Sequence, residues 1–172
     1  MEGFRRISPE ELDNVFRLVG KDWMLLTAAG RDAAGREPVN TMTASWGGMG
    51  VLWNRPVAFC FIRPQRYTFE LTERTDRLSL SFLGEEHRAA LRLCGTKSGR
   101  DTDKFAEAGI TPAKEDGTPF VGEANLVLFC RKLYADDLKK SAFLDPVLLD
   151  NYKQDDFHRV YVCEIEEAYV RE

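Results

Sequence analysis

The sequence predicts a mainly β protein of the α+β class, built as a closed or nearly closed barrel with short capping helices. Many segments show the two-residue alternation or the short apolar runs that are typical of strands. The segments between them are short and carry helix-capping and turn signals. No repeat, linker or low-complexity segment divides the 172 residues, so we expect residues 1–172 to form a single domain.

The composition is typical of a soluble globular protein, with 44% hydrophobic and 30% charged residues. The formal net charge of -4 is mild, so it gives no reason to expect nucleic acid or an anionic membrane as a partner. The sequence has no long apolar run and no basic leader followed by an apolar stretch. We therefore expect a cytoplasmic protein without a membrane partner.

The cysteines do not form a metal-binding pattern. Cys60, Cys94, Cys130 and Cys163 lie far apart and have no CxxC or His/Cys ligand spacing, so we predict no metal site. Three of them lie in apolar runs, where a free thiol behaves as a small hydrophobic group. Cys94, beside Gly95 in an expected loop, is the cysteine that we place nearest to a possible ligand.

The first part of the chain predicts a short helix and then a two-stranded antiparallel unit. Ser8, followed by Pro9 and two acidic residues, is a helix-start signal. Residues 22–28 are predicted as the first buried strand. Residues 31–36 carry the glycines of a hairpin turn, and residues 37–46 form the second strand.

The middle of the chain predicts a central strand between turns. Residues 47–50 are glycine-rich and are expected to form a flexible corner, and residues 54–56 form a turn. Residues 57–62 are uninterruptedly apolar, which predicts a strand that is covered on both faces. Residues 65–74 show helical spacing, and residues 77–83 alternate as a strand.

Short helices and two further strands are expected after this point. The predicted helices are residues 85–93, residues 102–108 with Asp101 as the N-cap and Gly109 as the end, and a capped turn at residues 145–149. Residues 94–101 are expected to form a loop and residues 110–122 to be irregular. The remaining predicted strands are residues 124–134 and 157–165.

We expect the functional site to form around residues 40–48. Read as a strand, this segment places hydroxyl groups and a glycine on one face and apolar side chains on the other. The polar face consists of Thr41, Thr43, Ser45 and Gly47, and the core face of Met42, Ala44 and Trp46. Hydroxyl groups are adaptable hydrogen-bond donors, and the glycine pair allows a ligand to approach the main chain closely.

A basic turn follows the apolar strand and indicates an anion site. Arg63 and Arg66 come with the hydroxyl groups of Tyr67 and Thr68, and Thr68 lies near an expected helix start, where free N–H groups favour a phosphate. The alternative is a solvated strand face beside an unrelated basic turn.

Taken together, these segments resemble the flavin reductase-like family, the FMN-binding split β-barrel proteins that include flavoredoxin. The resemblance is carried by residues 40–47, residues 63–68, residues 98–105 and the final strand from His158, and it spans about residues 20–166. It implies an FMN-binding split β-barrel with short capping helices. It also implies a homodimer whose interface lies close to the flavin.

The same resemblance assigns residues to the cofactor. It places Thr43, Ser45, Trp46, Gly47, Ser81 and Phe82 along the flavin, Arg63, Arg66, Tyr67 and Thr68 at the ribityl phosphate, and Ser98, Gly99 and Lys104 at the closing side of the site. No catalytic residue is implied, because FMN carries the redox chemistry. His158 is a candidate for positioning a nicotinamide. Many relatives have glycine near the end of this strand, where this chain has Cys163.

Each assignment has a structural alternative. Trp46 and Phe82 also fit a core, and His158 fits a structural role. The basic residues also fit ordinary roles: Arg66 paired with Glu70, Lys104 paired with Asp101 or Glu107, and Lys97 and Arg100 as solvated loop charges.

Three functions follow from these observations. The leading hypothesis is an FMN-dependent oxidoreductase that takes hydride from NADH or NADPH and passes electrons to a flavin, oxygen or a protein acceptor. The second is a flavoredoxin-type electron carrier that works with a redox partner protein, and the third is a barrel that binds no flavin. Haem ranks last, because only His87 and His158 are available as axial histidines. The chain has no GxGxxG fingerprint, and the resembled family has no Rossmann domain.

Overall fold

The computed structural model describes residues 1–31 and 34–172. The chain begins with strand β1 (Phe4–Ile7) and a 3₁₀ turn, Pro9–Glu11, that starts at Ser8. The Ser8 N–H donates to Glu11 Oε1 at 2.8 Å, which completes a capping box. The predicted helix start is confirmed, but the helical segment that follows is broken into α1 (Val15–Arg17) and a π-helical turn, Leu18–Asp22.

One antiparallel sheet forms the body of the molecule. Its strands, besides β1, are β2 (Met24–Ala29), β3 (Val39–Ala44), β4 (Gly47–Leu52), β5 (Arg55–Ile62), β6 (Arg77–Phe82), β9 (Leu126–Asp137) and β10 (Arg159–Arg171). Their hydrogen-bonded order is β3-β2-β6-β9-β10-β5-β4, with β1 also paired to β10. The strands at the two ends of this order, β3 and β4, are joined by Ser45 and Trp46 alone. The end strands β3 and β4 can be joined by so short a link only if the sheet curls back on itself. This curling gives the predicted nearly closed barrel.

The barrel interior is one apolar core. Leu26, Leu80 and Leu128 lie side by side on β2, β6 and β9, and all three are fully buried. Leu71 of α2 (Tyr67–Glu73) joins the same core, so this helix caps the barrel. Because apolar residues alternate along these strands, their side chains point to the same face of the sheet, and that face forms the barrel interior.

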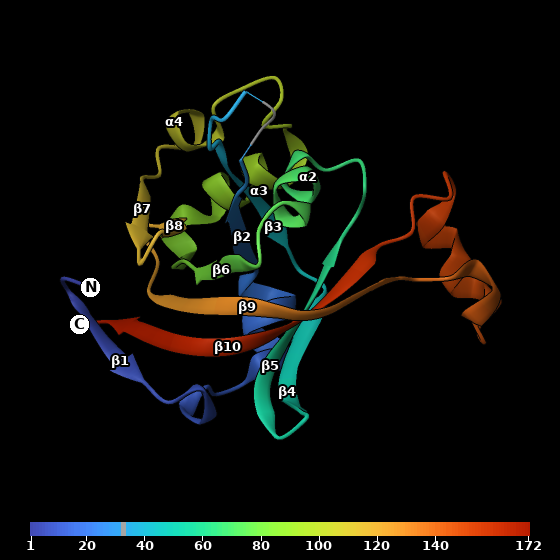
Figure 1. The fold of residues 1–172 in the computed structure, drawn as a ribbon, viewed down its shortest axis with the longest axis horizontal. Coiled ribbons are helices and arrows are strands. Elements are labelled where there is room, and N and C mark those ends of the chain that lie inside the picture. The colour runs from blue at the N-terminus through green and yellow to red at the C-terminus, as the bar shows by residue number, and fades with distance from the viewer. Residues whose placement is uncertain (32–33) are drawn as a thin grey trace.

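A second apolar cluster lies between the sheet and an outer layer. The outer layer consists of α3 (Arg88–Thr96), α4 (Lys104–Ala108) and a hairpin of β7 (Pro112–Glu115) and β8 (Thr118–Val121), with a 3₁₀ turn at Glu85–His87 before α3. Leu25 and Val127 from the sheet pack in this cluster with Leu91, Phe105 and Phe120 from the outer layer. Figure 1 shows this layer above β9 and β10, and it shows the segment between those two strands projecting to one side.

Two segments expected to be irregular are strands. Residues 47–50 belong to β4 rather than to a flexible corner, because their backbone pairs with β5. Gly47 has φ of 147°, and a Cβ there would lie 2.4 Å from the Phe59 carbonyl oxygen, so only glycine fits this pairing. Residues 110–122 contain the β7–β8 hairpin. Neither segment has the apolar alternation that identifies a strand from sequence.

Several element boundaries also differ from the prediction. Helix α3 continues to Thr96, so residues 94–96 are not a loop. Asp103, not Asp101, caps α4, and its carboxylate accepts from the Phe105 N–H at 3.0 Å. Strand β10 continues to Arg171, and β1 precedes the strand predicted as the first. In the predicted hairpin turn at residues 31–36, residues 32–33 lie outside the described residues.

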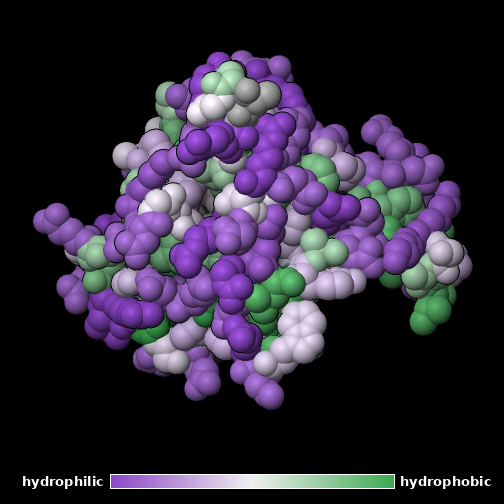
Figure 2. All heavy atoms as spheres, viewed as in Figure 1, coloured by the Kyte–Doolittle hydropathy of each residue, from purple (hydrophilic) through white to green (hydrophobic). Residues whose placement is uncertain are grey.

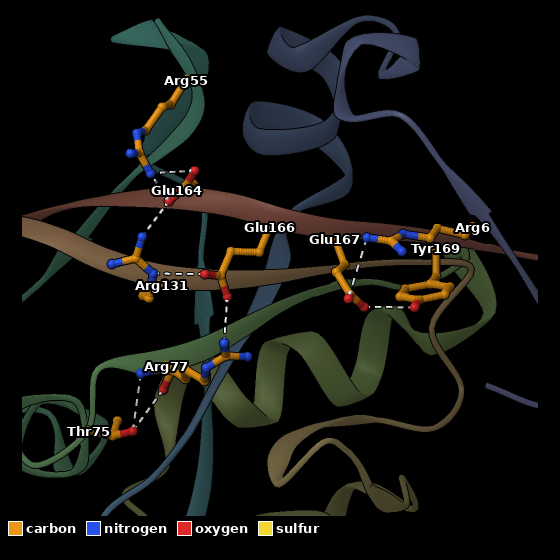
Figure 3. Close-up of polar contacts among 9 residues, drawn as sticks. All are labelled: Arg6, Arg55, Thr75, Arg77, Arg131, Glu164, Glu166, Glu167 and Tyr169. Atoms are coloured by element: carbon orange, nitrogen blue, oxygen red, sulfur yellow. Dashed lines mark hydrogen bonds and ion pairs between the residues drawn. The ribbon is translucent and has the colours of Figure 1, made fainter. Parts of the chain in front are cut away.

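The outward-facing charges of the sheet form a continuous ladder across four strands (Figure 3). Glu164 bridges Arg55 and Arg131, each at 2.7 Å, and Glu166 bridges Arg131 at 2.8 Å and Arg77 at 2.9 Å. An isolated surface pair adds little stability, whereas such a network adds more because each carboxylate serves two cations. The ladder makes this side of the barrel polar.

Candidate functional site

A cleft opens where the sheet is split between β3 and β4. It contains a cavity of about 180 Å³. The polar and aromatic residues that line it come from the end of β3 and its link to β4, from the end of β5 and the segment after it, and from the segment before β10: Thr43, Ser45, Trp46, Phe61, Arg63, Arg66 and His158. Trp46 lines the cleft and is 47% exposed. The alternative interpretation from the sequence, which placed Trp46 in the core, is therefore wrong.

A second cavity, of about 120 Å³, adjoins the first and shares Met42 and Arg66 with it. The further predicted site residues that line it are Tyr67, Thr68, Ser98 and Lys104. Asn40 supports this side, because its Nδ2 donates to Thr68 Oγ1 at 2.8 Å. The structure thus brings most of the predicted residues to two adjoining cavities.

Four predicted residues lie elsewhere. Gly47 serves the pairing of β4 with β5, as described above. Ser81 is fully buried, and its Oγ accepts from the Val121 N–H at 3.2 Å. Phe82 is buried in the barrel core. Gly99 lines neither cavity but packs on Asn40, where a Cβ would lie 2.1 Å from Oδ1.

Arg66 and Lys104 are cations without a carboxylate partner among the described residues. Arg66 Nη2 donates to the Gly95 carbonyl oxygen at 2.5 Å. Lys104 is buried, and its Nζ donates to the carbonyl oxygens of Thr41 at 3.0 Å and Cys94 at 2.9 Å. Burying a charge without a counter-charge is costly, so the cavity between these side chains favours an anion.

The ion pairs considered from the sequence do not form in the described part of the chain. Glu70 pairs with Arg100, and Glu107 pairs with Lys97. Neither carboxylate is therefore available to neutralise the charge of Arg66 or Lys104. Lys97, which also lines the second cavity, and Arg100 are thus paired, while Arg66 and Lys104 have no carboxylate partner among the residues that the structure describes.

Burial shifts the protonation equilibria of both cations. It lowers the pKa of Lys104 to about 8, with a further contribution from the positive charge of Arg66. Burial also lowers the pKa of Arg66, and the nearby guanidinium of Arg63 adds to this. An anion bound here would restore the pKa of Lys104 toward its ordinary value, because it stabilises the charged form.

Arg63, by contrast, is already held by the segment before β10. It forms an ion pair with Asp156, and its Nη2 donates to the Asn151 carbonyl oxygen at 2.9 Å. Its guanidinium lies 5.2 Å from the centre of the Tyr152 ring. Arg63 therefore brings less uncompensated charge to the cleft than Arg66 does. The sequence analysis did not identify Asp156 or Tyr152, because nothing local marks a contact across about ninety residues.

His158 forms one wall of the cleft. Its ring lies 5.3 Å from the Trp46 ring, centre to centre, and its Nδ1 lies 2.9 Å from the Tyr152 hydroxyl oxygen. Burial lowers the pKa of His158 to about 4, and Arg63 adds to this shift. The imidazole is therefore neutral at physiological pH.

The cysteines lie away from the cavities. Cys94 is inside α3, where burial raises the pKa of its thiol to about 11, and its carbonyl oxygen accepts from Lys104 Nζ. Cys163 lies in the barrel interior near Cys60. No cluster of three or more potential metal ligands occurs among the described residues. Within the same residues, no helix has both the length and the apolar composition needed to span a membrane.

A larger cavity of about 760 Å³ lies on the other side of Lys104, between β3, α4 and the β7–β8 hairpin. Tyr67, Gly99 and Lys104 border it. It shares Tyr67 and Lys104 with the second cavity of the cleft and no residue with the first.

Comparison with known families gives one match that covers most of the chain. The profile of a family described as "Flavin reductase like domain" matches residues 16–172. No curated protein sequence gives a significant match.

Solved structures share the fold at low sequence identity. The FMN-binding domain of a flavin reductases-like enzyme from Shewanella baltica OS155 has a TM-score of 0.68 and 17% identity, over 98% of this chain and 77% of that one. Flavoredoxin from Desulfovibrio vulgaris (Miyazaki F) has a TM-score of 0.65 and 20% identity, over 87% and 69%. The flavin reductase of the styrene monooxygenase from Pseudomonas putida S12 has a TM-score of 0.61 and 15% identity, over 87% and 80%. These likenesses confirm the predicted split-barrel fold.

Proposed function

Because the chain belongs to the flavin reductase-like family, we propose that it is an oxidoreductase whose cleft binds FMN. The observation that carries this proposal is the pair of cations, Arg66 and Lys104, at one cavity and without a carboxylate partner among the described residues. A dianionic phosphate would supply the missing negative charge and accept charge-assisted hydrogen bonds from both side chains.

The adjoining cavity suits a planar, partly apolar ring. Trp46 and Phe61 offer aromatic surface there, and the neutral His158 adds a polar edge. Thr43 and Ser45 border the same space, and the Thr43 hydroxyl group donates to the Leu91 carbonyl oxygen. A flat slot with a few convergent polar groups, next to an anion site, is the combination that a flavin mononucleotide requires.

Bound FMN would supply two-electron redox chemistry, which leaves binding, orientation and electrostatics to the protein. Arg66 and Lys104 would anchor the phosphate end. Trp46 and His158 would hold the ring end against the split of the sheet. His158 is neutral, so it adds no charge beside the ring.

We propose NADH or NADPH as the electron donor, and a flavin, oxygen or a redox partner protein as the acceptor. FMN-loaded protein should lose its flavin absorbance on addition of NADH or NADPH without oxygen, and regain it in air. A flavoredoxin-type electron carrier is the second candidate, supported by the structural likeness to flavoredoxin. Bleaching by dithionite but not by either nicotinamide would favour the carrier, and failure to bind FMN would contradict both.

FMN binding should depend on the protonation of Lys104. The affinity should be constant from about pH 6.5 to 7.5 and fall above pH 8, because the ammonium loses its proton near its pKa of about 8. One linked proton gives a decrease of up to about tenfold per pH unit. Calorimetric titrations between pH 6.5 and 9.5 measure the profile. Lys104→Met should flatten it, and an equally steep profile in that variant would contradict the assignment.

We also propose a homodimer, supported by the segment that projects between β9 and β10. Leu144 is 99% exposed and Val147 is 70% exposed on this segment, and Figure 2 shows apolar side chains gathered there. Exposed apolar clusters of this kind mark interaction surfaces. Light scattering should give twice the 19.6 kDa chain mass for the native protein. The double variant Leu144→Glu, Val147→Glu should give a monomer, and a dimer that survives both changes would exclude this surface.

Two expectations from the sequence analysis stay predictions. One is that residues 1–172 form a single domain, and the other is a cytoplasmic location.

A further inference from the structure

The segment between β9 and β10 is anchored at the cleft. We call residues 138–158 the arm. It contains two 3₁₀ segments, Lys140–Ala142 and Pro146–Tyr152, and projects from the barrel (Figure 1). Its base is closed by a hydrogen bond from the Leu138 N–H to the His158 carbonyl oxygen, at 2.9 Å. Contacts that fix the position of the arm therefore also fix the position of His158.

Tyr152 is packed among aromatic and charged side chains at this base. Its ring stacks on Phe157, with centres 4.8 Å apart and planes 19° apart, and meets Phe143 edge-on at 5.6 Å. Arg63 lies over the ring, and Tyr152 is 7% exposed. These contacts restrict the side chain, so its hydroxyl group is held toward His158 Nδ1 at 2.9 Å.

The hydrogen-bonding capacity of this pair indicates where the imidazole proton lies. Among the described residues, the Tyr152 hydroxyl has His158 Nδ1 as its sole hydrogen-bond partner. A neutral imidazole has one donor nitrogen and one acceptor nitrogen. If Tyr152 donates to Nδ1, both groups are satisfied and the imidazole proton is on Nε2. If Nδ1 donates instead, the phenolic proton has no acceptor among those residues.

The second ring nitrogen is open to the cleft. No hydrogen bond joins His158 Nε2 to any residue that the structure describes. Within the same residues, every fully buried polar side-chain atom has a partner, so Nε2 is not fully buried. Since His158 lines the cleft cavity, this nitrogen is available to a ligand there.

We infer that Tyr152 is a positioning residue that holds His158 in the Nε2–H tautomer, so that the cleft presents one hydrogen-bond donor to a carbonyl or carboxamide oxygen of its ligand. The inference extends the proposed function, and the identity of this ligand rests on that proposed function. The neutral state that it requires agrees with the pKa of about 4 that burial gives His158.

The arm holds the other side of the cleft as well. Asp156 pairs with Arg63 and accepts from Gln65 Nε2 at 2.7 Å, and the Asn151 carbonyl oxygen accepts from Arg63 at 2.9 Å. Arg63 and His158 are thus both oriented by arm residues. This arrangement makes the arm part of the site and not merely an appendage of the barrel.

Nitrogen-15 NMR of the imidazole rings tests the inference directly. The chain has two histidines, so a His87→Gln variant assigns the spectrum. At pH 7 the native protein should show His158 as a single Nε2–H tautomer. Tyr152→Phe keeps the stacked ring and removes the hydroxyl group, and it should give a mixture of tautomers. Tyr134→Phe, an exposed tyrosine on β9, is the matched control and should leave His158 unchanged.

An Nδ1–H tautomer in the native protein would overturn the inference, whether or not Tyr152→Phe folds. So would an unchanged tautomer in Tyr152→Phe. The measurement needs neither flavin nor nicotinamide, so its outcome is independent of whether the proposed function holds. If both hold, Tyr152→Phe should raise the KM for the nicotinamide donor about three- to tenfold, the range expected for one weakened hydrogen bond.

Discussion

Replacing Arg66 with methionine is expected to weaken FMN binding by about 10- to 100-fold, since a hydrogen bond to a charged group contributes about 1.5–3 kcal/mol. The expectation rests on the position of Arg66, which borders both cavities of the cleft and has no carboxylate partner in the described part of the chain. Methionine keeps much of the length of the side chain and removes the charge. Titration calorimetry of the apoprotein with FMN measures the loss.

Two controls separate a phosphate contact from general damage. Riboflavin lacks the phosphate, so its affinity should be nearly the same in Arg66→Met and in the native protein. Arg74→Met changes an exposed arginine at the opposite end of α2, and it should bind FMN as the native protein does. Equal losses for FMN and riboflavin would show that Arg66 acts on the slot as a whole and not on the phosphate.

Replacing Leu80 with alanine should lower the free energy of unfolding by about 2–5 kcal/mol, the usual cost of a large-to-small change in a core. Leu80 is fully buried and lies on β6 between Leu26 of β2 and Leu128 of β9. The three leucines meet where the curled sheet encloses its interior. A cavity at this position removes contacts on both neighbouring strands at once. Urea unfolding followed by circular dichroism measures the effect.

Val51→Ala is the matched control for the core. Val51 lies on β4 of the same sheet but is 75% exposed, so the change should alter stability by less than about 0.5 kcal/mol. A loss below about 1 kcal/mol for Leu80→Ala, outside the range for buried leucines, would contradict the description of this position as the centre of the barrel core.

The sequence predicted those strands whose apolar residues repeat locally. Residues 37–46 alternate, and residues 57–62 are continuously apolar, so β3 and β5 were both identified. Strand β4 was missed, because Gly47 to Gly50 offers almost no side-chain pattern and becomes a strand through pairing with β5. The β7–β8 hairpin was missed for a related reason, since prolines and glycines suggest irregular structure wherever their pairing partner is unknown.

The candidate site was predictable in its residue types but not in its charge balance. The hydroxyl row and the basic turn pointed to an anion site near Arg66. Whether Arg66 was neutralised depended on Glu70, which pairs with Arg100 from a loop thirty residues away. The contact of Arg63 with Asp156 spans a still longer separation. Such pairs depend on tertiary structure, which a local sequence pattern does not encode.

A titration of the purified protein with FMN, followed by visible absorbance, tests the central claim most directly. The account predicts a shift of the flavin bands that saturates at one FMN per chain, because the ring leaves water for the slot beside Trp46 and His158. Flavin bands that stay as in free solution at excess FMN would contradict it, and the cleft at the split of the barrel would then not be a flavin site.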